Sequence, residues 1–182
     1  ELEFVDFPQP LGRLEAFTTA GGTSTCPWTF KGKLKVLQNK TLRCPGHFAQ
    51  LKTMHDLGLF SDKEVKLTDG TKVVPRRVLQ ALLEPKIRLP GEKDLAVIRV
   101  KCLGEKNGQP AQAIVDVVDY YDDETGFTAM ERTTGWHASI VAIMMAQGET
   151  PRGAKPLEFA VSGRAFAREL RRRGIKLTET VT

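Results

Sequence analysis

Residues that could take part in chemistry gather at two places in the sequence. The first is a polar set in front of an apolar run, within residues 128–148: Glu131, Arg132, Thr133, Thr134, Trp136 and His137. The second is the segment KTLRCPGH, which places Arg43, Cys44 and His47 between an expected strand and an expected helix. Side chains and helix-terminal N–H groups converge at such junctions, so they are frequent ligand sites. Taken singly, each Arg or His of this kind is more often a structural partner or a solvated group.

Two helices must position these residues. In residues 128–148 the spacing of apolar side chains predicts a helix with one face in a core, ended by Gly148. Pro45 and Gly46 start a second expected helix, which Gly58 ends. The alternative to a ligand site there is that an acidic neighbour holds Arg43 and that His47 sits exposed or acts as a cap.

The remaining patterns predict an α+β fold. The two strongest strands are 95–103 and 111–121, and Asn107-Gly108 between them is a specific hairpin signal. Weaker patterns predict strands at 2–7, 33–43, 65–67 and 175–181, and helices at 73–83 and 164–173. Together they indicate a mixed, mainly antiparallel sheet with helices packed on one face.

Two loops allow a functional and a structural interpretation. The Gly- and Thr-rich segment 18–28 could let backbone N–H groups approach an anion, or it could be a turn into a short helix packed by Trp28 and Phe30. Asp122, Asp123 and Glu124 could hold a metal, but an exposed turn before a helix is the commoner explanation, so we expect no metal site.

The totals indicate one ordinary globular domain. A chain of 182 residues can bury a proper core but is short for two domains. It contains neither a secretory signal nor an apolar run long enough for a bilayer, so we expect a cytoplasmic protein that does not bind membranes. Cys26, Cys44 and Cys102 are far apart, which argues against a disulfide framework and structural zinc.

The net charge of +5 could suit an anionic partner. Much of the excess lies in residues 164–173, at the end of an expected helix, where cations complement the helix dipole, and stacking aromatics are absent there. We therefore expect no nucleic-acid partner, and we keep a stand-alone basic binding or scaffolding module as the alternative function. A hydrolase or metal enzyme ranks last, because neither GxSxG nor HExxH occurs.

Three segments together resemble one protein family. They are GRLEAFTTAGG at 12–22, KTLRCPGH at 40–47 and ERTTGWHASIVAIMMAQG at 131–148. In order and spacing they are similar to the C-terminal catalytic region of the saccharopine dehydrogenase and lysine 6-dehydrogenase family, from about residue 4 to about residue 174. The chain departs from many members at Ala20, where they carry Asp, and at Cys44, where they carry Tyr.

This resemblance implies an oxidoreductase that uses NAD or NADP and acts on the carbon–nitrogen bond of a lysine-derived amino acid. It also implies an α+β domain, like the C-terminal domain of glyceraldehyde-3-phosphate-dehydrogenase-like two-domain enzymes, that binds the substrate and forms a homodimer. The family's Rossmann domain and its Gly-rich dinucleotide loop are missing from this sequence. We therefore expect one substrate-binding and dimerisation domain over residues 1–182, without bound cofactor and inactive by itself.

Under this resemblance the two polar sets receive roles. Arg43 and Arg132 are the candidates for binding substrate carboxylates, because Arg offers a bidentate fork. His47 and His137 are the candidates for proton transfer, because His titrates near neutrality. Thr133, Thr134 and Trp136 are expected to line the same pocket, or else to pack the start of the helix.

Overall fold

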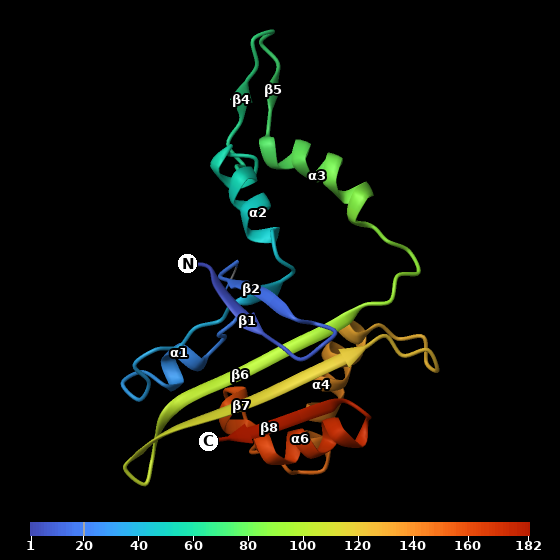
Figure 1. The fold of residues 1–182 in the computed structure, drawn as a ribbon. Coiled ribbons are helices and arrows are strands. Elements are labelled where there is room, and N and C mark those ends of the chain that lie inside the picture. Colours follow the sequence, from blue (N-terminus) through green and yellow to red (C-terminus); the bar gives the residue numbers. More distant parts are fainter. Residues whose placement is uncertain (20) are drawn as a thin grey trace. The chain divides into compact units, whose positions relative to one another are not determined.

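In the computed structural model, which describes residues 1–19 and 21–182, the chain forms two compact units. The first unit comprises Glu1–Ser24 and Lys35–Glu92, and the second comprises Thr25–Leu34 and Lys93–Thr182. Each consists of helices and antiparallel strands (Figure 1). The expected α+β class is confirmed.

The first unit begins with a three-stranded antiparallel sheet. β2 (Arg13–Phe17) lies between β1 (Glu3–Asp6) and β3 (Thr41–Arg43), and its last four residues are all buried. A helix, a two-stranded sheet and a second helix follow: α2 (His47–Asp56), β4 (Val65–Lys66), β5 (Lys72–Val73) and α3 (Pro75–Ile87). The expected helices therefore form here, at the positions that Gly46 and Pro75 mark.

The second unit is built on a long hairpin. β6 (Leu95–Lys106) and β7 (Gln109–Tyr120) pair along their whole length. Asn107 and Gly108 connect them with φ angles of 54° and 74°, and two successive positive φ angles are what a type I′ turn requires. β8 (Lys176–Val181) adds to the free side of β7, so the order is β6-β7-β8. The predicted hairpin and final edge strand are confirmed.

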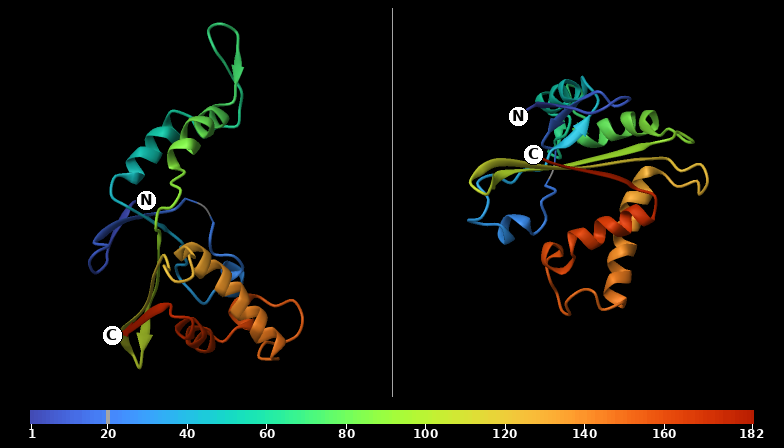
Figure 2. Two further views of the ribbon diagram at one scale, coloured as in Figure 1. Left: turned by 90° about the vertical axis from the view of Figure 1, so that its right-hand side faces the viewer. Right: turned by 60° about the horizontal axis from the view of Figure 1, so that its bottom comes forward.

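Helices cover one face of this sheet. α4 (Ala129–Ala146) and α6 (Gly163–Arg172) lie on the same side of it, in orange and red in Figure 2. Two short helices complete the unit: α1 (Cys26–Thr29) and α5 (Leu157–Ala160). The core joins strand and helices through five buried side chains: Val117, Ile140, Met144, Leu170 and Ile175.

Three details differ from the sequence-based expectations. The expected strand at 33–43 exists only as β3, because β2 pairs with Thr41–Arg43 and the lysine-rich residues before them have no strand partner among the described residues. The strands form three separate sheets rather than one, and every described pairing is antiparallel. Trp28 does lie in a short helix, but it is 77% exposed rather than packed.

Within the described part of the chain, no helix combines the length and the apolar character needed to cross a bilayer.

Candidate active site

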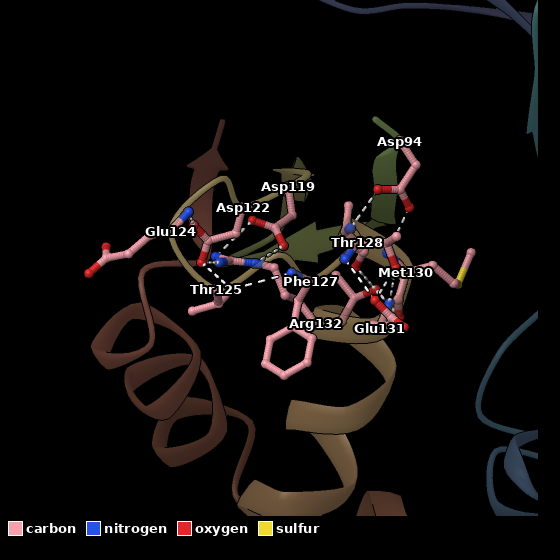
Figure 3. Close-up of polar contacts among 12 residues, drawn as sticks. Asp94, Asp119, Asp122, Glu124, Thr125, Phe127, Thr128, Met130, Glu131 and Arg132 are labelled. Atoms are coloured by element: carbon pink, nitrogen blue, oxygen red, sulfur yellow. Dashed lines mark hydrogen bonds and ion pairs between the residues drawn. The ribbon is translucent and has the colours of Figure 1, made fainter. Parts of the chain in front are cut away.

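The start of α4 is held by three side chains. Thr128 and Glu131 form a capping box, in which the Thr128 hydroxyl accepts from Glu131 N–H and the Glu131 carboxylate accepts from Thr128 N–H. Asp94, just before β6, accepts from the backbone N–H groups of Ala129 and Met130 at 2.6 and 3.0 Å. Figure 3 shows these contacts. Negative charge at a helix N-terminus is favourable, so the first turn of α4 is firmly fixed.

Arg132 lies at the centre of a buried ion-pair cluster (Figure 3). Its Nε donates to Asp119 at 2.8 Å, and one terminal nitrogen donates to Asp122 at 2.5 Å. Its guanidinium also stacks on the ring of Trp136, 4.5 Å from the centroid. Arg132 and Asp119 are only 8% and 5% exposed. A buried charge needs a charged, hydrogen-bonded partner, and each of these two groups supplies it for the other.

The Arg132 fork is therefore already engaged by two carboxylates. A substrate carboxylate would have to displace Asp119 or Asp122 in order to bind it. Binding of substrate by Arg132 stays a prediction, while the contacts themselves favour a structural role. A shallow cavity of about 250 Å³ opens beside the cluster, lined by both of these Asp residues, Arg132 and Lys176 among others.

The other candidates on α4 do not point in one direction. Trp136 packs against the core one turn after Arg132. The Thr133 hydroxyl donates to the carbonyl of Ala129 at 2.8 Å, and Thr134 is exposed. His137 is exposed and meets Phe166 edge to face, with ring centroids 5.2 Å apart. Thr133 and His137 thus lie to the side of the Arg132 cluster, and their place in a substrate pocket stays a prediction.

The second polar set forms a corner between β3 and α2. Gly46 is the N-cap of α2, has a φ angle of 93°, and carries no side chain that could cap the helix. The cap comes instead from Glu15 on β2, whose carboxylate accepts from the N–H groups of Gly46 and Phe48, both at 2.8 Å. These two N–H groups, Phe48 first, lower the pKa of Glu15 below its ordinary value of 4.5, with a further contribution from the charge of His47. Glu15 is therefore a buried carboxylate whose ionised form is favoured by the two N–H groups that it accepts from.

His47 and Arg43 stand on this fixed corner. The His47 ring is half-buried and stacks on Phe17 of β2, with centroids 6.4 Å apart. Arg43 is exposed, and its side chain donates to the carbonyl of Leu42. Within residues 1–19 and 21–182 it has no ion-pair partner, so the alternative that an acidic neighbour holds it is not seen. Its fork remains available for a carboxylate ligand.

The candidate residues are divided between the two units. Arg43 and His47 belong to the first unit, and Arg132, Thr133, Thr134, Trp136 and His137 belong to the second. That they share one cleft stays a prediction. The departure from the family at Ala20 lies outside the described residues.

The acidic turn before α4 has a structural explanation. The Asp122 carboxylate accepts from Glu124 N–H at 3.1 Å and from the Thr125 hydroxyl at 2.9 Å, and Asp123 pairs with Lys93. The Thr125 hydroxyl, the Glu124 N–H and the charge of Arg132 lower the pKa of Asp122. Among the described residues no group of three His, Cys, Asp or Glu side chains is arranged to hold a metal ion.

The basic helix α6 is largely paired. Arg171 binds Glu179, while Arg172 and Arg173 bind Glu169. Its apolar side supplies Leu170 to the core. Two carboxylates, Glu169 and Glu179, thus serve the arginines of this helix, so the segment keeps a net positive charge and the stand-alone basic module stays an alternative.

Sequence reasoning did not identify Glu15, Asp94 or Asp119. Asp119 could have been found, because strand alternation places it on the same face as Val117, where a charge requires a buried partner. Glu15 and Asp94 give no such signal, since each caps a helix more than 30 residues further along the chain.

A dinucleotide site is not part of the described fold. Such sites are built on parallel strands joined by a helix, and every strand pairing among the described residues is antiparallel. The described residues therefore do not include the parallel strand–helix–strand unit on which a dinucleotide site is built.

Comparison with known protein families matches most of the chain to one of them. The family model for the saccharopine dehydrogenase C-terminal domain matches residues 2–175, and the chain belongs to this family. The family takes its name from an oxidoreductase, saccharopine dehydrogenase.

Two relatives with assigned names are similar over part of the chain. Carboxynorspermidine synthase of Vibrio cholerae serotype O1 is 34% identical over 102 residues, and that of Vibrio alginolyticus is 33% identical over 102 residues. Each match covers 53% of this chain and 24% of the relative. The matched part is thus about a quarter of the length of these relatives.

Proposed function

We propose that the chain is the substrate-binding and dimerisation domain of an NAD(P)-dependent oxidoreductase that acts on a carbon–nitrogen bond of a lysine-derived amino acid. The saccharopine and lysine dehydrogenases catalyse reactions of this class. The proposal rests most directly on the corner at the start of α2. This corner holds an exposed Arg43, which has no ion-pair partner among the described residues, and a half-buried His47 four residues later. Membership of the saccharopine dehydrogenase C-terminal family supports it.

The corner has the two groups that such a substrate needs. A guanidinium fork binds a carboxylate through two parallel hydrogen bonds and so orients the amino acid. Oxidation of an amine or reduction of an imine also requires a proton acceptor or donor beside the reacting nitrogen, and an imidazole can serve as either. The nicotinamide cofactor would supply the hydride chemistry. Arg43 thus holds the substrate, and His47 transfers the proton.

Kinetics of the full-length enzyme test this assignment. Loss of a charge-assisted hydrogen bond costs about 1.5–3 kcal/mol, so we expect Arg43→Ala to lower kcat/KM by roughly 10- to 150-fold, mainly through KM. Arg43→Lys should recover only part of this loss, because Lys lacks the fork. Arg77→Ala on α3 is the matched control, because Arg77 is another exposed arginine of the same unit. Unchanged kinetics in Arg43→Ala would contradict the assignment.

A second candidate substrate is a carboxylated polyamine. It is favoured by the name of the similar relatives, carboxynorspermidine synthase. Such a compound also offers a carboxylate to Arg43, so the site alone does not separate the two. Assays of the full-length enzyme with saccharopine, lysine and carboxynorspermidine, with NAD and NADP in turn, discriminate between them.

We also propose that the β6–β7–β8 sheet contributes to a homodimer interface. Ile98, Val100 and Val181 lie on the helix-facing side of this sheet by register, yet they are 47%, 53% and 64% exposed. We call these three residues the apolar stripe. A second copy of the chain would remove this surface from water.

A further inference from the structure

We infer that Glu15 is a positioning residue for the proposed substrate corner, and that its carboxylate keeps the substrate's carboxylate off the start of α2 and directs it to Arg43. The inference rests on the proposed function. It concerns a residue that contacts neither substrate nor cofactor in the proposed arrangement. Its basis is the geometry of the buried carboxylate and of the helix start that it occupies.

The start of α2 depends on Glu15 because it has no local cap. Helices usually begin with Ser, Thr, Asp or Asn at the N-cap, whose side chain accepts from an N–H group of the first turn. Here the N-cap is Gly46, and the carboxylate 31 residues earlier in the chain takes that role with both of its oxygens. Removing it would leave the Gly46 and Phe48 N–H groups without an acceptor.

The position of Glu15 also connects the whole corner. It lies in the middle of β2, where it faces Phe4 of β1 and Arg43 of β3 in register. Its carboxylate holds the N–H groups on either side of His47, while Phe17, two residues further along β2, stacks on the His47 ring. One short strand therefore fixes both the backbone at His47 and the plane of its ring.

The charge of Glu15 has a consequence for substrate orientation. A helix start with free N–H groups is a natural binding site for a carboxylate. At α2 that site is already filled by a carboxylate of the protein, which repels a second one. Arg43, directly opposite Glu15 on the neighbouring strand, is then the cation that we assign to the substrate, because Arg13 on the same strand as Glu15 already lies near Asp6 and over the ring of Phe4. Among the described residues, the charged and titratable groups of these elements include Arg13 and Glu15 from β2, Arg43 from β3, and Cys44 and His47 from the turn into α2.

Chemical rescue tests the first half of the inference. Glu15→Ala removes CH₂–COO⁻, for which acetate is the matching fragment. At equal ionic strength, we expect acetate to raise the midpoint of thermal unfolding of Glu15→Ala more than chloride does. The reason is that acetate would bind to the vacated start of α2 in the folded chain. The wild-type chain is the control for the general effect of acetate on stability, because Glu15 there occupies the start of α2. If acetate and chloride act alike on Glu15→Ala, the vacated helix start is no carboxylate site and the inference is overturned.

Kinetic coupling in the full-length enzyme tests the second half. We expect Glu15→Gln, which keeps the shape but loses the charge, to lower kcat/KM about tenfold, with Glu15→Asp closer to wild type. In an Arg43→Ala background, Glu15→Gln should leave kcat/KM almost unchanged, because the effects of substitutions at neighbouring residues that act together are not additive. Asp94→Asn should change kcat/KM by the same factor in the wild-type enzyme and in the Arg43→Ala enzyme. Equal losses for Glu15→Gln in both backgrounds would mean that Glu15 only stabilises the fold, and would overturn the positioning role.

These outcomes are distinguishable from failure of the proposed function. If the wild-type full-length protein turned over none of the amino acids or polyamines above, the proposed function would fail, while acetate could still stabilise Glu15→Ala. If the enzyme is active but Glu15→Gln and Arg43→Ala are additive, the proposed function stands and only the inference about Glu15 fails.

Discussion

Replacing Arg132 by Met separates a structural arginine from a substrate ligand. Met keeps most of the apolar stem but removes the cation that pairs with Asp119, which is 5% exposed. Breaking a buried ion pair by removing one partner typically costs about 3–5 kcal/mol, because the remaining charge is left buried and uncompensated. With a urea dependence of about 2 kcal/mol per molar, the unfolding midpoint should fall by roughly 1.5–2.5 M.

Tryptophan fluorescence is a suitable assay for this loss. The chain has two tryptophans, and Trp28 is 77% exposed, so Trp28→Phe provides a background at little cost. Trp136 then reports on the second unit alone, and it lies directly against Arg132. Midpoints rather than intensities are compared, because Arg132→Met also changes the surroundings of the Trp136 ring.

Two further variants make the result decisive. Arg171→Met removes an arginine of the same unit whose partner, Glu179, is exposed, and it should cost no more than about 1 kcal/mol. Adding Asp119→Leu to Arg132→Met should recover part of the loss, because the uncompensated charge is then gone. A midpoint of Arg132→Met within roughly 0.5 M of the parent, which corresponds to about 1 kcal/mol, would refute the structural role.

Two other predictions concern assembly and acid stability. Val100→Lys should dissociate a homodimer in sedimentation experiments. Leu103→Lys, on the opposite face of the same strand, should leave the dimer intact. Equal effects of the two substitutions would argue against the apolar stripe as the interface. Glu15 and Asp122 have pKa values lowered from 4.5 and 3.8, so the unfolded chain binds more protons than the folded chain in acid. Their contribution to stability is complete above about pH 5 and is lost as the pH falls through the folded pKa values. Between about pH 5 and pH 2.5 the free energy of unfolding, measured by urea titration, should therefore fall less for the Glu15→Gln/Asp122→Asn double variant than for wild type. An equal fall in both proteins would contradict this account.

Local signals in the sequence predicted the elements that depend on neighbouring residues. Asn107-Gly108 predicted the hairpin, because few residue pairs adopt two positive φ angles readily. Gly148 predicted the end of α4, and it adopts a positive φ angle of 73° directly after the C-cap residue. In both cases the deciding contacts lie within a few residues of one another.

Features that depend on distant residues were missed or wrong. The alternation at 33–43 suits a strand, but β2 is five residues long and pairs with only three of them. Glu15 looks like an ordinary polar residue of a strand, and its role becomes visible only when α2 is placed against it. Arg132 was found as a notable residue, but its partners could not be assigned, since Asp119 and Asp122 compete with a substrate as explanations of a buried guanidinium.

The position of β8 has a consequence for folding during synthesis. β6 and β7 pair across a two-residue turn, so this hairpin can form as soon as both strands have left the ribosome. The core nevertheless includes Ile175, and the third strand of the sheet runs to Val181. Until these residues emerge, one side of β7 and the apolar side of α4 stay open to water and to other chains. The nascent second unit thus exposes an unpaired strand edge and apolar surface until its last strand has been synthesised.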